Sequence, residues 1–493
     1  MSQILSDKYK TLGILLVLTA GALLVQGYHP WSEDAEIYLP GVEKILHPEL
    51  FPVGREFFQS HASLTFFPNI VAFSLRLTHL PFETGIFLWH VASIFFLLLA
   101  CWQMSGLFFP GRRSARWCGV SLVAALLTIP VAGTALYVMD QYLNPRNLAA
   151  FAGIFAVTKI LEGKYLRALL WTAFAACVHP LMWMFPFSFC ALFLVMSKYE
   201  SRKKGVTLSA MATFWPSIPL APPSSPVYHE VAKLHGYFYI QKWAWYEIVG
   251  AVAPIGLFWW FARLARDRQW SLLDRVCRAF AIYGVIYLVI SLALDLPARF
   301  EALARLQTLR SLHLLYIALF LVIGGFLGEY VLRDRIWRWL LLFVPLSLGM
   351  FMAQRALYPA SAHVEWPFAA PRNPWAQAFV WIRQNTPEDA VFAIDPEYMR
   401  IVGEDEIGFR CLAQRSRLAD WVKDNGAVSM FPSLADEWWN QVQAQTPWKS
   451  FHAEDFSRLK KAYKANWVVV PQPGVAGLNC AYQNSAVRVC RIP

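Results

Sequence analysis

The chain has 493 residues, 57% of them hydrophobic and 16% aromatic, with a mean hydropathy of +0.38. Repeated apolar runs of about 20 residues match the length needed to cross a bilayer, which excludes an ordinary soluble protein. The net charge of +11 does not indicate a nucleic-acid surface: residues 353–493 carry 15 Lys and Arg against 14 Asp and Glu, which leaves 29 against 19 for residues 1–352.

The excess positive charge lies in four short loops of the membrane half. Clusters of this kind mark the cytoplasmic loops of polytopic membrane proteins. They are Arg112, Arg113 and Arg116; Lys198, Arg202, Lys203 and Lys204; Arg263, Arg266 and Arg268; and Arg333, Arg335 and Arg338.

The first apolar segment, Leu12–Val25, is followed by a stretch too rich in carboxylates to lie in lipid. We expect residues 28–62 to form the first loop outside the membrane. Glu33, Asp34 and Glu36 would lie there on a short amphipathic helix against the bilayer surface. The apolar positions that would hold this helix to the interface are Tyr38, Leu39 and Ile45.

About twelve segments are apolar and long enough to be candidate membrane helices. They are Leu12–Val25, Leu64–Leu80, Gly85–Met104, Trp117–Val138, Ala149–Leu161, Leu166–Val178, Leu181–Met196, Val206–Leu220, Glu247–Phe261, Val276–Leu294, Leu312–Gly328 and Ile336–Met352.

The orientation follows from the charged loops, with one exception. With the amino terminus inside, we expect the three later clusters in the cytoplasm and residues 353–493 outside. Strict alternation over the first three segments puts Arg112, Arg113 and Arg116 outside. Either one early segment is a re-entrant or surface helix, or the charge rule fails locally.

Prolines occur in or beside several of these segments: Pro130, Pro180, Pro186, Pro216 and Pro254. Proline removes a backbone donor and tends to kink or break a helix. Broken helices in a bilayer must face protein or water, so we expect a hollow in the membrane domain, residues 1–352.

The composition changes after Met352. Residues 353–372 are predicted to be a linker, and residues 373–493 a small soluble α/β domain outside the membrane. The patterns predict helices and strands in this order: helix Trp375–Gln384, strand Ala390–Ile394, helices Ser433–Gln443 and Glu454–Lys464, strand Trp467–Val470, and a closing hairpin.

The closing hairpin has a cysteine at each end. Cys480 and Cys490 flank Ala481–Val489, and they could form a disulfide if the compartment is oxidising. No Asn-x-Ser/Thr acceptor site occurs in the chain, which favours a bacterial inner membrane over a eukaryotic secretory route.

The acids of the first loop are the leading catalytic candidates. A carboxylate at the mouth of an apolar cavity is partly desolvated, which raises its proton affinity and suits it to act as a general base on a hydroxyl. The alternative is an ordinary solvated helix face, the usual role of a charge run.

The opening of the chain resembles the glycosyltransferase C (GT-C) superfamily. The resemblance rests on the first apolar segment, then Glu33, Asp34, Ala35 and Tyr38, then Leu50, Phe51 and Pro52. Relatives similar to protein mannosyltransferases and aminoarabinose transferases carry Asp-Glu-Ala and a Tyr at this place. Here the order of the two acids is reversed; we favour Asp34, because Ile37 and Tyr38 follow it as an Ile-Tyr pair follows a single Asp in other branches.

The region after the last apolar segment also resembles bacterial members of this superfamily. Trp381, Ile382, Arg383, Asn385, Thr386, Pro387, Asp389 and Ala390 match a W-I-R-x-N-T-P-x-D-A pattern, and Trp467–Pro471 is similar to a later strand. The resemblance implies a polytopic enzyme that transfers a sugar from a polyprenyl-phosphate carrier, with an acid of the first loop as the base.

A polyprenyl phosphate requires cationic partners, and the planar guanidinium of arginine can bind two phosphate oxygens at once. The alternative for each arginine is an interfacial position that binds lipid headgroups. The candidates are Arg146, Arg299, Arg305 and Arg310.

Histidines at helix ends are weaker candidates, because such histidines are more often structural. His61 and His179 are the two that we consider for substrate binding. No His/Cys/Asp cluster has zinc spacing, so no metal ligands are predicted, although a divalent cation is left open as a cofactor.

The sequence therefore predicts an inverting sugar transferase that takes its sugar from a lipid-phosphate donor, with Asp34 as general base and an unknown acceptor hydroxyl outside the membrane. The first alternative is a lipid or solute transporter or flippase. Transporters usually place ionisable groups near the bilayer midplane, whereas here the acids lie at the rim. The second alternative is a catalytically silent scaffold, because a retained fold does not prove retained chemistry.

Overall fold

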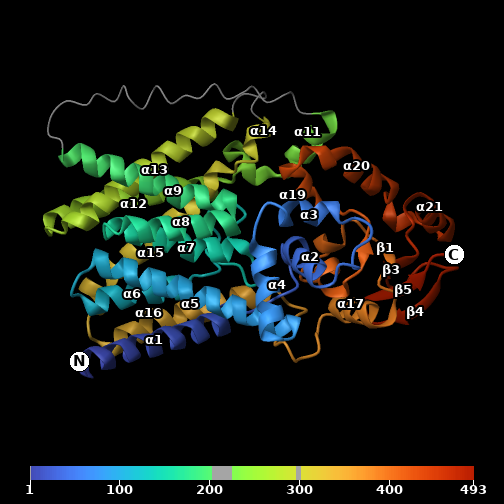
Figure 1. The fold of residues 1–493 in the computed structure, drawn as a ribbon, viewed down its shortest axis with the longest axis horizontal. Helices are drawn as coiled ribbons and strands as arrows, with labels where there is room; N and C mark the ends of the chain where they lie inside the picture. The colour runs from blue at the N-terminus through green and yellow to red at the C-terminus, as the bar shows by residue number, and fades with distance from the viewer. Residues whose placement is uncertain (1, 202–224, 296–300) are drawn as a thin grey trace. The chain divides into compact units, whose positions relative to one another are not determined.

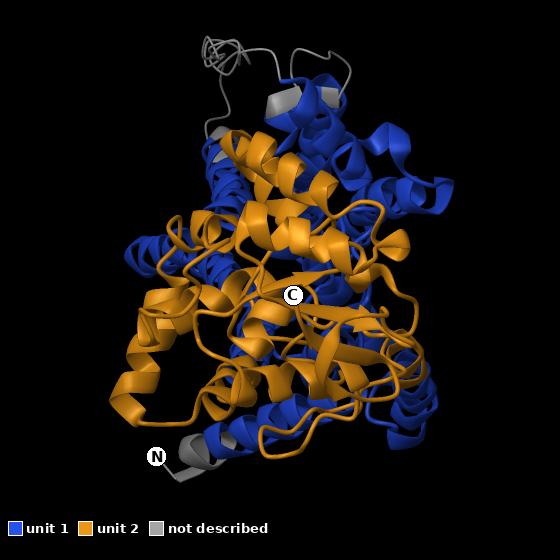
Figure 2. Cartoon of the chain, turned by 90° about the vertical axis from the view of Figure 1, so that its right-hand side faces the viewer, with its two compact units in different colours: residues 1–25, 92–140, 146–350 blue, residues 26–91, 141–145, 351–493 orange. Residues whose placement is uncertain are grey.

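The computed structural model describes residues 2–201, 225–295 and 301–493 (Figure 1). Two compact units are assembled from interleaved segments of the chain. Unit 1 holds residues 1–25, 92–140 and 146–350, and unit 2 holds residues 26–91, 141–145 and 351–493 (Figure 2). The acidic first loop and the carboxyl-terminal segment thus belong to the same unit.

Unit 1 is helical, as its apolar runs predict; α5 and α16 each have one end in unit 2. Its α-helices are α1 (Ser2–Gln26), α5 (Phe82–Phe108), α6 (Arg113–Ala125), α7 (Pro145–Leu161), α8 (Tyr165–Val178), α9 (Pro180–Ser201), α11 (Pro226–Leu234), α12 (Trp245–Asp267), α13 (Ser271–Asp295), α14 (Glu301–Ala304), α15 (Leu312–Phe326) and α16 (Ile336–Leu357). Shorter helical turns are η1 (Gly236–Phe238), η2 (Ile240–Lys242), η4 (Thr308–Ser311) and η5 (Leu327–Leu332).

Within the described residues, seven helices are long and apolar enough to cross a membrane. Each coincides with one of the predicted segments, so the prediction of a polytopic membrane protein is confirmed. They are Lys8–Gln26, Phe82–Phe108, Pro180–Lys198, Trp245–Asp267, Ser271–Leu294, Thr308–Leu332 and Ile336–Leu357.

The other five predicted spans are not among these seven helices. Val206–Leu220 lies outside the described residues. The helices α4, α6, α7 and α8 have 12, 13, 17 and 14 residues. At 1.5 Å per residue, α4 is about 18 Å long, too short for a hydrocarbon core of about 30 Å. The segment Trp117–Val138 is not one helix, because α6 ends at Ala125 and turns follow.

Glycines allow α6 and α15 to pack closely against each other. A Cβ placed on Gly324 would lie 2.6 Å from the Cα of Gly119, so neither position accepts a larger side chain without a shift. Small residues let membrane helices approach closely and gain dispersion contacts. The helical stretch Thr308–Leu332 is the most enclosed of the seven candidate spans, with 83% of its apolar window buried.

The prolines do not break these helices as expected. Pro186 and Pro254 lie inside α9 and α12, which continue through them. Pro180 is the first residue of α9, where its missing N–H costs nothing, and Pro130 lies beyond the end of α6 in an isolated β-bridge with Tyr137. Pro216 lies outside the described residues.

Unit 2 combines helices with a five-stranded sheet in the order β2-β1-β3-β5-β4. Strand β1 runs parallel to β2 and β3, and β5 runs antiparallel to β3 and β4. The strands are β1 (Val391–Ile394), β2 (Ser416–Arg417), β3 (Trp467–Pro471), β4 (Asn479–Gln483) and β5 (Val487–Arg491). The helices are α2 (Ala35–Leu46), α3 (Glu56–Ala62), α4 (Phe67–Thr78), α17 (Pro374–Asn385), α18 (Phe409–Ala413), α19 (Lys423–Met430), α20 (Ala435–Ala444) and α21 (Ala453–Tyr463), with the turns η6 (Tyr398–Arg400), η7 (Pro432–Leu434) and η8 (Trp448–Ser450).

The predicted α/β elements of the carboxyl-terminal segment are confirmed to within a few residues by α17, β1, α20, α21, β3 and the β4–β5 hairpin. Cys480 and Cys490 face each other across that hairpin and form a disulfide. Strand β2 and the helices α18 and α19 were not predicted. Their sequences are short and charged, so they carry little hydrophobic periodicity.

The helix of the first loop is enclosed by protein, which corrects the expectation of a helix against the bilayer surface. Residues Ala35 to Glu43 of α2 are buried, and α2 contacts α3, α4 and α18. Tyr38 and Leu39 are 8% and 0% exposed, so they serve the core of unit 2. Burial by a distant part of the chain cannot be read from the local apolar spacing.

Candidate active site

Glu33 and Asp34 lie on the turn that leads into α2. Their side chains are 32% and 24% exposed, so both are reachable from solvent yet partly desolvated. Glu33 has a φ of +58°, a left-handed conformation that is uncommon for a residue with a Cβ and that often occurs at functional sites. The Asp34 N–H donates to the hydroxyl of Tyr142 over 3.4 Å, which fixes the backbone of this turn.

Lys423, the first residue of α19, forms ion pairs with both acids. Its Nζ lies 3.3 Å from Oδ1 of Asp34 and also contacts the carboxylate of Glu33. Burial lowers the pKa of Lys423, but the carboxylates of Glu33, Asp34 and Glu406 outweigh this and hold that pKa above its ordinary value. The ammonium group therefore stays charged and balances the acids.

Glu406 adds a third carboxyl group to this cluster. Its backbone carbonyl accepts the N–H of Glu33 over 3.1 Å, and its side chain hydrogen-bonds the side chain of Glu33. Burial, then the nearby carboxylate of Glu33, raises the pKa of Glu406 to about 8. At neutral pH Glu406 thus keeps a proton, which it can donate to the Glu33 carboxylate.

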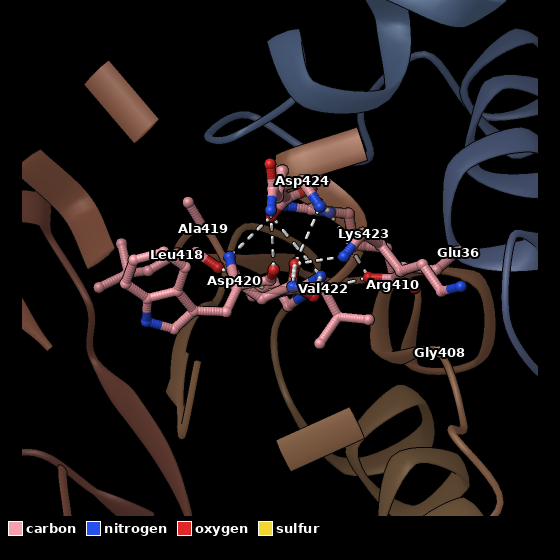
Figure 3. Close-up of polar contacts among 12 residues, drawn as sticks. Glu36, Gly408, Arg410, Leu418, Ala419, Asp420, Val422, Lys423 and Asp424 are labelled. Atoms are coloured by element: carbon pink, nitrogen blue, oxygen red, sulfur yellow. Dashed lines mark hydrogen bonds and ion pairs between the residues drawn. The ribbon is translucent and has the colours of Figure 1, made fainter. Parts of the chain in front are cut away.

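The position of Lys423 is set by a capping residue (Figure 3). Oδ1 of Asp420 accepts the N–H groups of Val422, Lys423 and Asp424 at 3.1, 2.8 and 2.9 Å, which satisfies the first orphan donors of α19. The other oxygen of Asp420 accepts from Nη2 of Arg417 over 2.5 Å. The start of α19, and with it Lys423, is therefore held in place.

Glu36 lies in a buried ion network instead of at the solvent-reachable cluster (Figure 3). Its carboxylate is 0% exposed and accepts from Nε of Arg417 over 2.9 Å and from the N–H of Cys411 over 3.3 Å. Arg410 lies 3.5 Å away and binds Asp424 through two bonds of 2.8 and 2.9 Å. Burial raises the pKa of Glu36, and the two guanidinium groups partly offset this.

This network joins α2 to the carboxyl-terminal part of unit 2. Two buried arginines face three buried carboxylates, Glu36, Asp420 and Asp424. Such groups are costly to bury unless they are paired, and here each carboxylate has a cationic partner. Glu36, one of the three predicted catalytic acids, is placed to hold α2 in position.

His61 lies near the same cluster. Its ring packs edge-on against Tyr38 at 6.0 Å and Phe431 at 5.4 Å between centroids. Burial lowers the pKa of His61 to about 4, with a partly compensating increase from the carboxylate of Asp34. His61 is therefore neutral at pH 7, which suits it to hydrogen bonding but not to binding a phosphate by charge.

In unit 1, Arg146 is the second residue of α7 and is 8% exposed. Its Nη2 and Nε lie 3.1 and 3.3 Å from Oδ2 of Asp140. The N–H of Asp140 donates to Oδ1 of Asn147 over 3.3 Å. The guanidinium of Arg146, a predicted phosphate ligand, is therefore already paired with the carboxylate of Asp140.

Arg310 is a better-placed candidate for an anion. It lies in η4, 9% exposed, and lines a crevice with His313 of α15. The other walls of the crevice are apolar, among them Gly153, Pro186 and Leu314. Arg305 is half-buried just before η4, and Arg299 lies outside the described residues.

His179 has a structural position at the junction of α8 and α9. Its Nδ1 accepts the N–H of Met182 over 3.3 Å, which satisfies one of the free donors at the start of α9. A histidine in this role caps a helix, in agreement with the structural alternative considered from the sequence.

Sequence reasoning missed Lys423, Glu406 and the two buried arginines, Arg410 and Arg417. All four lie within 18 residues of one another in a stretch dense in charge. One signal was available: the charged residues alternate with short apolar groups, which is unusual for a solvated loop. Their pairing with the first loop, nearly 400 residues away, has no signature in the local sequence.

The side chains around Lys423 can be compared with the ligands that a divalent cation requires. Among the described residues, no group of three or more His, Cys, Asp or Glu side chains is arranged to hold a metal ion. Lys423 lies where a cation would bridge Glu33 and Asp34. The residues present do not fit a metal, and we derive no step through one.

Comparison with solved structures identifies the fold. The apo form of an oligosaccharyltransferase from Archaeoglobus fulgidus is similar to the chain with a TM-score of 0.50 at 12% identity, covering 94% of this chain and 70% of that one. The oligosaccharyltransferase AglB of the same organism, in complex with an inhibitory peptide and a dolichol-phosphate, aligns with a TM-score of 0.47 at 11% identity over the same shares. The chain has a GT-C-like fold.

Sequence comparisons add one match. A family described as a domain of unknown function (DUF6798) covers residues 373–444. This range includes Lys423, Glu406 and both buried arginines. No curated protein matches the chain.

Proposed function

We propose that this chain is a membrane glycosyltransferase that moves a sugar from a polyprenyl-phosphate donor to an acceptor hydroxyl, with inversion at the anomeric carbon. The observation that carries the proposal is the partly exposed carboxylate of Asp34, which lies beside Lys423 in the loop after the first membrane span. The GT-C-like fold supports the class of reaction by analogy only.

In the proposed reaction Asp34 takes the proton of the acceptor hydroxyl. The hydroxyl oxygen attacks the anomeric carbon from the face opposite the phosphate, and the bond between that carbon and the phosphate oxygen breaks. The lipid phosphate leaves with the bonding electrons. A single displacement of this kind inverts the configuration and requires one base and one cationic group for the leaving phosphate.

Asp34 is the preferred base among the three predicted acids. Glu36 is fully buried, with hydrogen bonds to both of its carboxylate oxygens, so a substrate cannot reach it. Glu33 accepts hydrogen bonds from both Lys423 and Glu406, so its carboxylate is already engaged within the protein. Asp34 has a longer contact to Lys423 and keeps part of its surface open.

Of the predicted phosphate ligands described in unit 1, Arg310 is the one best suited to an anion. It lines a crevice of about 20 Å³ with a histidine among apolar walls, and a guanidinium suits phosphate oxygens. Arg146 is less suited, because its guanidinium already binds Asp140.

The proposal is tested by label transfer. Wild type, Asp34→Asn and the matched control Asp436→Asn, an exposed acid on α20, are purified and supplied with radiolabelled undecaprenyl-phosphate hexoses and membrane extract. We expect Asp34→Asn to lose transfer about 10²- to 10⁴-fold, the contribution of a positioned general base, and Asp436→Asn to behave like wild type.

Unchanged transfer in Asp34→Asn would remove this residue from the mechanism. Movement of labelled sugar across vesicles without cleavage of the sugar–phosphate bond would contradict the transferase and favour the transporter.

A further inference from the structure

A basic pocket lies in unit 1, and it shares no lining residue with the crevice of Arg310. Its volume is about 280 Å³. Four cationic side chains and two tryptophans line it, and none of its lining residues is acidic: Lys10, Arg112, Arg113, Arg116, Trp102 and Trp117. We call this set the basic pocket.

The basic pocket lies at one end of the membrane helices. Lys10 is near the start of the first candidate span, Lys8–Gln26, and Trp102 is near the end of the second, Phe82–Phe108. The two helices therefore run in opposite directions, with the pocket at the ends they share. Tryptophan and basic residues concentrate at such boundaries between hydrocarbon and water.

The same geometry resolves the exception in the predicted orientation. Because α4 is too short to span the bilayer, one crossing fewer separates Lys10 from the cluster of Arg112, Arg113 and Arg116. That cluster lies at the same end as the start of α1, as the shared pocket requires. This arrangement supports an early segment that does not cross the membrane, and not a local failure of the charge rule.

Two of the four cations are held by neighbours. The guanidinium of Arg116 lies 3.3 Å from the centroid of the Trp102 ring, and its Nε donates to the Trp102 carbonyl over 2.9 Å. Arg112 forms an ion pair with Glu329 and lies 4.8 Å from the ring of Trp270. These contacts fix two charged groups at the wall of the pocket.

The other two cations of the pocket are Lys10 and Arg113. In the part of the chain that the structure describes, no carboxylate lies within ion-pair distance of either. The indole N–H of Trp102 is a buried donor that meets no acceptor among the described residues. The basic pocket thus presents net positive charge and an unused hydrogen-bond donor.

We propose that the basic pocket binds the phosphodiester headgroup of an anionic phospholipid. Its volume suits a headgroup and not a whole lipid, so the acyl chains would run along the apolar helix surfaces. Basic pockets between membrane helices bind acidic headgroups in this way, with the arginines as phosphate ligands. The same chemistry would accept inorganic phosphate, so the two sources must be separated by experiment.

The test uses the full chain purified in neutral detergent and transferred to nanodiscs. Binding of phosphatidylglycerol is measured by native mass spectrometry for wild type and for Lys10→Gln/Arg113→Gln, which leaves the two paired arginines in place. The matched control is Arg333→Gln/Arg335→Gln. It removes the same charge at the same end of the helices, because Ser114 of α6 hydrogen-bonds Asp334 over 2.8 Å, yet neither residue lines the pocket.

We expect wild type and the control to retain phosphatidylglycerol in preference to phosphatidylcholine. Each removed cation should weaken binding about fivefold, so the pocket variant should bind about 25-fold more weakly. Inorganic phosphate at 10 mM should compete poorly, because it lacks acyl chains.

Equal losses in both double variants would overturn the proposal, since they would indicate unspecific surface attraction. Full competition by inorganic phosphate would also overturn it, in favour of a free-anion site. An unchanged melting temperature in phosphatidylcholine nanodiscs verifies that the pocket variant is folded. Since no step of sugar transfer is involved, failure of the proposed function would leave this result intact.

Discussion

Asp34 and Glu36 are two residues apart and occupy opposite environments within unit 2. Glu36 is sealed from solvent and bound to Arg417 and Arg410, so its charge is used to hold the fold. Asp34 is 24% exposed and lies 3.3 Å from the ammonium group of Lys423, so a substrate could reach it. Neighbouring acids in one short motif therefore differ in burial, which separates the structural role of Glu36 from the chemical role that we propose for Asp34.

The largest effect is expected when the charge of Glu36 is removed, because this tests whether Glu36 has a structural role. In Glu36→Gln, two buried arginines lose one of their three carboxylate partners, and breaking a buried pair typically costs about 3–5 kcal/mol. We expect a loss of that size in the free energy of unfolding, measured by chemical denaturation in detergent. Activity should fall in proportion to the folded fraction.

The control for this prediction is Glu454→Gln, an exposed acid in the first turn of α21. It should change stability by less than about 0.5 kcal/mol. If Glu36→Gln were as stable as wild type and lost transfer, Glu36 would belong to the chemistry, and the division between the two acids would be wrong.

The second prediction concerns Lys423, the cationic partner of Glu33 and Asp34. In Lys423→Met the carboxylates of Glu33 and Asp34 lose the cationic partner that favours their charged forms. We expect the acidic limb of the pH–rate profile to move upward by about one unit, while the rate on the plateau falls by less than 10-fold. A profile that does not move would indicate that Lys423 has no influence on the proposed base.

The smallest effect concerns Glu406. Its folded-state pKa of about 8 lies above its ordinary value of 4.5, so the proton stabilises the folded state fully below pH 4.5. That stability is lost as the pH rises through about 8. Glu406→Gln mimics the protonated form and removes this dependence.

The measurement is the melting temperature, followed by tryptophan fluorescence at pH 7.5 and pH 9. We expect the wild type to lose about 2–4 °C more than Glu406→Gln over this interval, which corresponds to roughly 1 kcal/mol. Identical slopes would contradict the assignment of a retained proton to Glu406.

Patterns within the sequence determined the membrane helices, because a run of about 20 apolar residues has few other stable states in water or lipid. They also determined α17, β1, α21 and β3, whose apolar spacing identifies the face that must be buried. The acidic first loop was recognised from its composition, and the GT-C-like fold from short motifs at both ends of the chain.

Only the tertiary structure decided which acid stays reachable. Arg410 lies 374 residues beyond Glu36, and Lys423 lies 389 residues beyond Asp34. The tertiary structure also brought Lys10 and the loop after α5 to one pocket. Local spacing fixes which face of a helix is apolar, but the dielectric surroundings of a charge depend on the groups that pack over it, and here those groups come from the far end of the chain.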